Sequence, residues 1–215
     1  ENKLDIRRSF GKKQLFNLSA AYSTYRKSKI SYLNDLVNLE KTVIPTESAS
    51  DTTTFRNYFS RATYSNEKLA NLTFQSGIEI TYENAESKRL TEKEHIGDLS
   101  AFLSMKYAPW NSFTLQPGIR YIYNFRYDAP LVYSMNLKWA LYRQLRVRAS
   151  YAKGFRAPSI KELYLDFHDI NHNISGNPNL EAETGDNLNG WIDLDFGPQQ
   201  QSFTLSNNVY YNRIK

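Results

Sequence analysis

Residues 72–83 read LTFQSGIEITYE, and this stretch decides the fold class. Apolar side chains recur at Leu72, Phe74, Ile78, Ile80 and Tyr82, and the positions between these five are polar or glycine. A period of two is typical of a β-strand, because successive side chains of a strand point to opposite faces. The stretch therefore predicts a strand with one apolar and one polar face.

Similar alternation recurs along the 215-residue chain. It predicts further strands at residues 4–10, 14–26, 55–64, 98–107, 113–123, 131–139, 145–152, 188–196 and 203–211. Short turns are expected near residues 11, 66, 110, 143 and 198, and usually longer loops at 30–52, 84–96, 125–130 and 155–184. An antiparallel up-and-down β-barrel of the membrane type alternates short turns with long loops in this way. The expected fold is all-β with about ten strands.

Two local features test this assignment. Pro117 falls inside a predicted strand, where a proline normally requires an edge or a bulge. Pro109, Trp110 and Asn111 are expected to form a tight turn, and residues 65–68 another.

Composition narrows the class of protein. No run of eighteen apolar residues exists and the mean hydropathy is −0.61, so a spanning helix is not expected, although a membrane barrel stays compatible. Aromatic residues make up 14% of the chain. The absence of cysteine excludes disulfides and thiolate metal sites. No compact basic run is interleaved with aromatic residues, so no nucleic-acid partner is expected.

Alternation alone does not say which face is inside. The polar face bears many charges, and a small ten-stranded barrel would have to hold them in a narrow lumen, whereas a plugged barrel of about 22 strands has room. We therefore expect residues 1–215 to be part of a larger barrel. Ile78, Ile80, Leu103, Leu115 and Leu137 are then expected to face lipid, and Glu79, Arg120 and Arg148 to face the lumen. A soluble ligand-binding β-barrel is the alternative.

The segment 151–183, YAKGFRAPSIKELYLDFHDINHNISGNPNLEAE, leaves a strand near residue 152 and shows no second strand signal. Residues 159–164 are expected to form one short helical turn with Pro158 near its first position. Gly176-Asn177-Pro178 has turn chemistry. Long connections of a β scaffold are where binding residues concentrate.

Two boxes in this segment resemble those of a known family. Phe155, Arg156, Ala157 and Pro158, followed by Asn177, Pro178, Asn179 and Leu180, resemble the FRAP and NPNL boxes of TonB-dependent outer-membrane receptors. The resemblance implies a barrel in the bacterial outer membrane and energy-coupled uptake of a scarce nutrient such as haem, a ferric siderophore or cobalamin. It also implies coupling to an inner-membrane complex through a plug domain, expected outside these residues together with the remaining strands. The boxes themselves are expected to be loop scaffold.

All three histidines, His95, His168 and His172, fall in predicted loops. Imidazole is a common metal ligand, and in haem receptors of the resembled family an axial histidine lies between the two boxes. The resemblance therefore implies that His168 or His172 could ligate the iron of transported haem, with Tyr164 and Asp169 as further candidate ligand-binding residues. Asp166 or Asp169 could orient the ring. Alternatively, these side chains only hydrogen-bond the loop; no resident cofactor is required.

An enzyme is not predicted. The sequence has no G-x-S-x-G, H-E-x-x-H, Walker A or G-x-G-x-x-G motif. Asp193 and Asp195 share one strand face and could be a carboxylate pair, but a charged lumen wall is the favoured interpretation. A barrel hydrolase would need a serine or a carboxylate close to His168 or His172, and no motif marks one.

Overall fold

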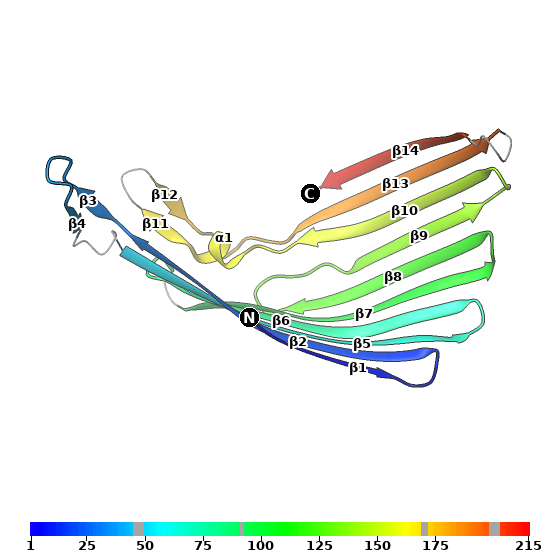
Figure 1. Cartoon of the computed structure of the whole chain (residues 1–215), viewed down its shortest axis with the longest axis horizontal. Helices are drawn as coiled ribbons and strands as arrows, with labels where there is room; N and C mark the ends of the chain where they lie inside the picture. The colour runs from blue at the N-terminus through cyan, green and yellow to red at the C-terminus, as the bar shows by residue number, and fades with distance from the viewer. Residues whose placement is uncertain (45–49, 91–92, 169–171, 198–202) are drawn as a thin grey trace.

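A computed structural model describes residues 1–44, 50–90, 93–168, 172–197 and 203–215. Ten strands form one sheet in sequential antiparallel order, as predicted. They are β1 (Asn2–Ser9), β2 (Gln14–Ile30), β5 (Ser50–Leu69), β6 (Leu72–Glu86), β7 (Glu94–Trp110), β8 (Phe113–Asn124), β9 (Val132–Ala140), β10 (Leu145–Arg156), β13 (Glu183–Phe196) and β14 (Phe203–Ile214). Figure 1 shows a curved sheet with tight turns at one end and long connections at the other.

The two faces of the sheet differ as the alternation predicts. Ile78 and Ile80 are 54% and 49% exposed, whereas Glu79 between them is 9% exposed on the inner face. By the strand register, the other predicted lipid-facing residues lie on the same face as the two isoleucines: Leu103, Leu115 and Leu137. The other predicted lumen residues, Arg120 and Arg148, lie on the same face as Glu79. The two predicted sets therefore lie on opposite faces of the sheet, as the alternation requires.

Aromatic rings form two rows on the outer face, one near each end of the strands. Near the loop end, successive ring centroids lie 5.0, 6.2, 5.9 and 5.6 Å apart in the row Tyr22, Tyr58, Tyr82, His95 and Phe125. Near the turn end, the corresponding separations are 5.4 and 6.0 Å in the row Trp110, Phe113 and Trp139. Such rows are typical of the two water interfaces of a membrane barrel.

The two rows lie about a bilayer apart. Phe113 of one row and Phe125 of the other are twelve residues apart in the chain, which at ~3.4 Å each is about 41 Å along the strand. A tilt of about 40° reduces this to about 31 Å, so the rows flank the roughly 25 Å apolar band of outer-membrane barrels. No helix in the described parts of the chain is long and apolar enough to span a membrane.

Several strands are longer than predicted. β5 runs from Ser50 to Leu69, so the predicted turn at 65–68 is wrong, and the chain turns at Ala70 and Asn71 instead. The predicted loop at 30–52 contains a hairpin of β3 (Tyr32–Asn34) and β4 (Lys41–Val43). Pairing of β5 with both β2 and β6 extends it beyond its apolar residues.

The two proline-containing features also differ in detail. Pro109 and Trp110 belong to β7, and only Asn111 and Ser112 form the turn. Pro117 lies in a central strand, not at an edge; its pairing with Met135 of β9 is kept, while the β7–β8 ladder runs to Gly118 and resumes at Leu115. A bulge follows between Tyr107 and Trp110. The missing N–H of proline is thus accommodated at a local irregularity of one ladder.

Two loop predictions need correction. His95 lies in β7 and belongs to the outer aromatic row, so it is not a loop residue. β10 extends to Arg156, and the following connection contains α1 (Ile160–Tyr164) and a second hairpin, β11 (Asp166–His168) with β12 (Asn173–Ser175). The hairpin was not predicted, because three-residue strands are too short to show a period.

Candidate functional site

The first part of the β10–β13 connection is a capped helical turn. Ser159 is the N-cap of α1: its hydroxyl accepts a hydrogen bond from the Glu162 amide, and the Glu162 carboxylate accepts one from the Ser159 amide. This capping box satisfies two backbone donors that a helix start leaves unpaired. Pro158 therefore precedes the cap and is not the first helical residue.

The NPNL box closes the same helix from the other side. The Asn177 amide donates to the Glu162 carbonyl at 2.9 Å, and the Gly176 amide donates to the Leu165 carbonyl at 2.6 Å. A Cβ on Gly176 would lie 2.6 Å from the backbone of Leu163, so only glycine fits this close approach. Asn177 of the box thus contributes a backbone contact to the end of α1.

Arg156 of the FRAP box joins the root of the loop to its helix. Its guanidinium forms an ion pair with Glu162 and another, at 3.6 Å, with Glu183 at the start of β13. The neighbouring Ser159 amide and hydroxyl, followed by Arg156, lower the pKa of Glu162 from its ordinary value. Arg156 thus links the end of β10 both to α1 and to the start of β13.

The loop folds inward and docks on strands that are distant in the sheet. Ile160 and Leu163 are 2% and 3% exposed, and Ile160 packs with Ala85 and Leu90. Leu165 forms a β-bridge with Leu90, and the Asp166 amide donates to the Arg89 carbonyl at 2.8 Å. The sheet order places β8 and β9 between β10 and β7, so the loop reaches past two strands.

Phe167 of β11 anchors the second hairpin. The Arg89 guanidinium lies 3.8 Å from the centre of the Phe167 ring, and the Lys29 ammonium lies 5.7 Å from it. The ring of His172 stacks on Phe167 with centroids 5.1 Å apart. Cation–π contacts of this kind hold the hairpin against the ends of β2 and the 87–90 segment.

The four candidate ligand-binding residues have different surroundings. Both ring nitrogens of His168 have partners: Nδ1 lies 2.5 Å from Asn173 Oδ1, and Nε2 lies 2.6 Å from Asp166 and 3.2 Å from Ser175. Tyr164 lies at the end of α1, with the Arg126 guanidinium 5.6 Å from its ring centre. Asp169 lies outside the described residues. In the described parts of the chain, no three His, Cys, Asp or Glu side chains form a metal-ligand group.

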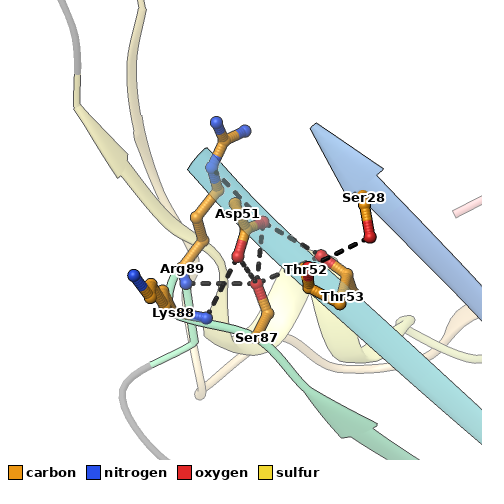
Figure 2. Close-up of polar contacts among 7 residues, drawn as sticks. All are labelled: Ser28, Asp51, Thr52, Thr53, Ser87, Lys88 and Arg89. Carbon is orange, nitrogen blue, oxygen red and sulfur yellow. Dashed lines mark hydrogen bonds and ion pairs between the residues drawn. The ribbon is translucent and has the colours of Figure 1, made fainter. Parts of the chain in front are cut away.

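A polar cluster that was not predicted lies beside the docked loop. The Asp51 carboxylate accepts hydrogen bonds from the hydroxyls of Ser87 and Thr53 and from the Lys88 amide, at 3.1–3.3 Å. Arg89 Nε lies 3.6 Å from the same carboxylate. Figure 2 shows these groups converging on Asp51, and beside them a separate contact of 3.1 Å between the hydroxyls of Ser28 and Thr52.

A cavity of about 260 Å³ adjoins this cluster, between β2, β5, the 87–90 segment and α1. Four cationic side chains line it: Lys27, Lys29, Arg89 and Lys161. None of these was singled out from the sequence. Residues 27–29 and 87–89 lie in polar stretches without periodicity. They meet because β2 pairs with β5 at residues 51–53, and the Asp51 carboxylate binds Ser87, Lys88 and Arg89.

Deeper in the lumen the carboxylates are bound by arginines. Glu79 forms ion pairs with Arg61 and Arg120. Asp193 binds Arg148 at 2.5 Å, and Asp195 binds Arg146 at 3.1 Å. These contacts support the charged-wall interpretation of the two aspartates over a catalytic pair.

The sequence also did not predict a contact on the inner face between Tyr127 and Asp98. Tyr127, in the β8–β9 loop, donates its hydroxyl hydrogen to Asp98 at 3.0 Å. Burial and the nearby Asp98 charge raise the pKa of Tyr127 above its ordinary value. Its ring also approaches Phe155 near the end of β10, with centroids 6.5 Å apart, so the β8–β9 loop contacts the strand from which the β10–β13 connection starts.

The family described as TonB dependent receptor-like, beta-barrel, matches residues 2–215. The chain belongs to the TonB-dependent receptor family. This barrel lies in the bacterial outer membrane, and the family consists of transport receptors, not enzymes, as expected. The hydrolase and soluble-barrel alternatives are therefore set aside.

Solved receptors share the fold at low sequence identity. A double mutant of the ferric enterobactin receptor PfeA from Pseudomonas aeruginosa matches with a TM-score of 0.75 and 19% identity, covering 99% of this chain and 34% of that one. The siderophore receptor PirA from Acinetobacter baumannii matches with a TM-score of 0.72 and 14% identity, covering 97% of this chain and 34% of that one. The FrpB iron transporter from Neisseria meningitidis matches with a TM-score of 0.65 and 11% identity, covering 99% of this chain and 36% of that one. This TonB-dependent receptor segment thus spans about a third of their length, and no curated protein matches it.

Proposed function

We propose that this barrel segment belongs to a receptor that imports an anionic iron chelate across the outer membrane, driven through a plug domain by the TonB complex. The observation that supports the proposal most directly is the inward-docked β10–β13 loop. It brings α1 over the inner face at the long-loop end of the sheet, which in outer-membrane barrels is the extracellular end. A ligand that arrives from outside the cell contacts a loop in that position before it enters the lumen.

The charge of this region indicates the sign of the cargo. Lys27, Lys29, Arg89 and Lys161 converge on the cavity beside the loop, and Arg126 lies over Tyr164 nearby. A cleft lined by one sign of charge raises the local concentration of oppositely charged ligands. The names of the similar receptors, for ferric enterobactin, a siderophore and iron, support an iron chelate over cobalamin.

The test uses the full-length receptor in a bacterial strain that makes no siderophore of its own. Under iron limitation, the receptor should restore growth on at least one ferric chelate from a panel, and deletion of TonB should abolish that growth. Uptake that persists without TonB, or growth that is indifferent to the receptor gene, would contradict the proposal.

Haem is the second candidate cargo, because His168 and His172 lie between the two boxes. The partners on both ring nitrogens of His168 favour a loop-stabilising role, since iron binding would require one of them to leave. We expect His168→Ala and His172→Ala, made singly and together in the full receptor, to leave haem absorption unchanged. A weakened and shifted haem band in either variant, with normal outer-membrane expression, would instead identify haem as the cargo.

A further inference from the structure

The cavity beside α1 has an excess of positive charge. Of its described lining residues, Lys27, Lys29, Arg89 and Lys161 are cationic and Asp51 is the one carboxylate. Asp51 already accepts hydrogen bonds from Ser87, Thr53 and a backbone amide, in addition to its ion pair with Arg89. Among the described residues, Lys27, Lys29 and Lys161 form no ion pair, and of the three Lys161 has the Glu83 carboxylate near enough to interact with its charge. The carboxylate therefore balances only part of the charge.

Arg89 presents an unsatisfied donor. Its Nε faces Asp51 and its plane lies on Phe167, but Nη2 is buried and has no hydrogen-bond partner in the described parts of the chain. A guanidinium has five N–H donors and no acceptor, and buried donors are almost always paired. An acceptor oxygen entering the cavity would meet the lysines and lie beside the Arg89 guanidinium, which lines the same cavity.

The remaining wall of the cavity is apolar and aromatic. Tyr25 and Phe55 line it with ring centroids 6.4 Å apart, and Leu90, Ile160 and Leu165 contribute aliphatic surface. Its volume of about 260 Å³ lies below the roughly 300–1,000 Å³ usual for a drug-sized ligand. The cavity therefore fits one small group with a flat apolar body and an anionic end.

We propose that this cavity is a subsite for an aryl carboxylate, with the carboxylate on Arg89 and Lys29 and the ring against the wall that Tyr25 and Phe55 form side by side. The inference rests on the proposed receptor function, in which such a group would be one arm of the cargo or a small acid bound beside it. Lys27 and Lys161 add to the positive field, and α1 closes the cavity from above.

The test titrates the purified full-length receptor with benzoate, acetate and inorganic phosphate by calorimetry. Benzoate should bind saturably with a Kd on the order of 1 mM or tighter, as about nine heavy atoms at modest ligand efficiency allow. Acetate lacks the ring and should bind at least about tenfold more weakly. Phosphate binding equal to that of benzoate would overturn the role of the aromatic wall and reduce the cavity to a simple anion site.

Variants of the cationic residues that line the cavity test whether benzoate binds there. Lys29→Gln should weaken benzoate binding about tenfold, as expected for losing a charge-assisted hydrogen bond. Arg89→Lys keeps the charge but not the planar donor set, and should also weaken it. Lys93→Gln, an exposed lysine in the same connection that does not line the cavity, is the matched control and should bind as the wild type does.

Three results would overturn the subsite: no saturable benzoate binding by the wild type, equal binding by Lys29→Gln, or an equal loss in Lys93→Gln. Lys29 makes no hydrogen bond in the Asp51 cluster, so its replacement keeps the test valid if Arg89→Lys fails to fold. A receptor that transports a ferric chelate through TonB but fails the benzoate titration refutes the subsite alone. Failure of chelate uptake refutes the proposed function instead.

Discussion

Two connections at the extracellular end each contain a short hairpin, yet they behave differently. The β2–β5 connection extends away from the sheet, and its tip residues Leu36 and Val37 are 82% and 90% exposed. In the β10–β13 connection α1 packs on the sheet, and its residues Ile160 and Leu163 are almost fully buried. Both connections have a hairpin of two three-residue strands, so hairpin size does not explain the difference.

The difference lies in what each hairpin is attached to. The exposed hairpin is held by local bonds, chiefly from the amides of Val37 and Asn38 to the Asp35 carboxylate. The docked hairpin follows a capped helical turn whose two apolar residues meet a matching surface at Ala85 and Leu90. Inward docking therefore depends on a few long-range apolar contacts rather than on loop length.

The largest expected effect comes from removing such a contact. Ile160→Ala should destabilise docking of the loop by about 2–5 kcal/mol, because a buried isoleucine is replaced and a cavity is left. Hydrogen exchange at the Asp166 and Gly176 amides, both bonded in the docked loop, measures the change. Leu36→Ala in the exposed hairpin is the control and should stay within about 0.5 kcal/mol. Equal effects in the two connections would contradict the comparison.

Gly176→Ala should destabilise the docked loop by about 1–3 kcal/mol, as overpacking does. The new Cβ would lie 2.6 Å from the backbone of Leu163 and Tyr164, and that backbone can move only if the helical turn opens. Gly190→Ala in β13 is the control, since a Cβ at that position would meet no atom within 4 Å. Loss of exchange protection at the Leu165–Gly176 bond is the measurement, and unchanged protection would contradict the close approach.

The exposed hairpin should respond to glycine in the opposite direction. Leu39 has a φ of 58°, a left-handed conformation that costs a non-glycine residue about 1–2 kcal/mol. Leu39→Gly removes this strain at an entropic cost of about 0.5–1 kcal/mol, so a net gain of about 0.5–1 kcal/mol is expected. Slower exchange of the Asp35 amide, bonded to the Glu40 carbonyl at 2.9 Å, would show it. Faster exchange would refute the strain argument.

The smallest effect is a pH dependence that both connections share. Hydrogen bonds from Ser159 lower the pKa of Glu162, and the amides of Val37 and Asn38 lower that of Asp35. A lowered folded-state pKa means that each carboxylate stabilises its loop above its ordinary pKa near 4, and that the contribution is lost as the pH falls through the lowered value. Amide chemical shifts of Ser159 and Val37 should change in that acidic range.

Matched variants isolate each contribution to this pH dependence. Glu162→Gln should remove the acid-dependent change at Ser159 and leave the change at Val37, and Asp35→Asn should do the reverse. A Ser159 shift that still titrates in Glu162→Gln would assign the effect to another carboxylate.

The barrel strands could be predicted where one face is apolar. Alternation marks Leu72–Tyr82 and its neighbours because lipid selects apolar residues on the outer face. It fails for Arg26–Ile30 and Ser50–Thr54, which pair with each other in the sheet but are mostly polar. These segments lie beyond the outer tyrosine row, where water reaches both faces and no period appears in the sequence.

The site was predictable only in part. The two boxes and Ser159–Tyr164 mark the loop, its helical turn and its closing turn, because caps and glycine turns are local chemistry. The cavity depends on Lys29, Arg89 and Ile160, which are far apart in the chain and meet only through strand register and the Leu90–Leu165 bridge. The burial of Glu79 between two arginines depends on the same long-range register.

The aromatic row near the loop end also shows how far the cationic cavity lies from the membrane surface. Lys29 lies seven residues beyond Tyr22 on β2, or roughly 24 Å along the strand and about 18 Å along the membrane normal at a 40° tilt. The Debye length at physiological ionic strength is about 8 Å. The negative lipid head groups are therefore screened from the cavity, and its lysines act on dissolved anions with little competition from the membrane surface.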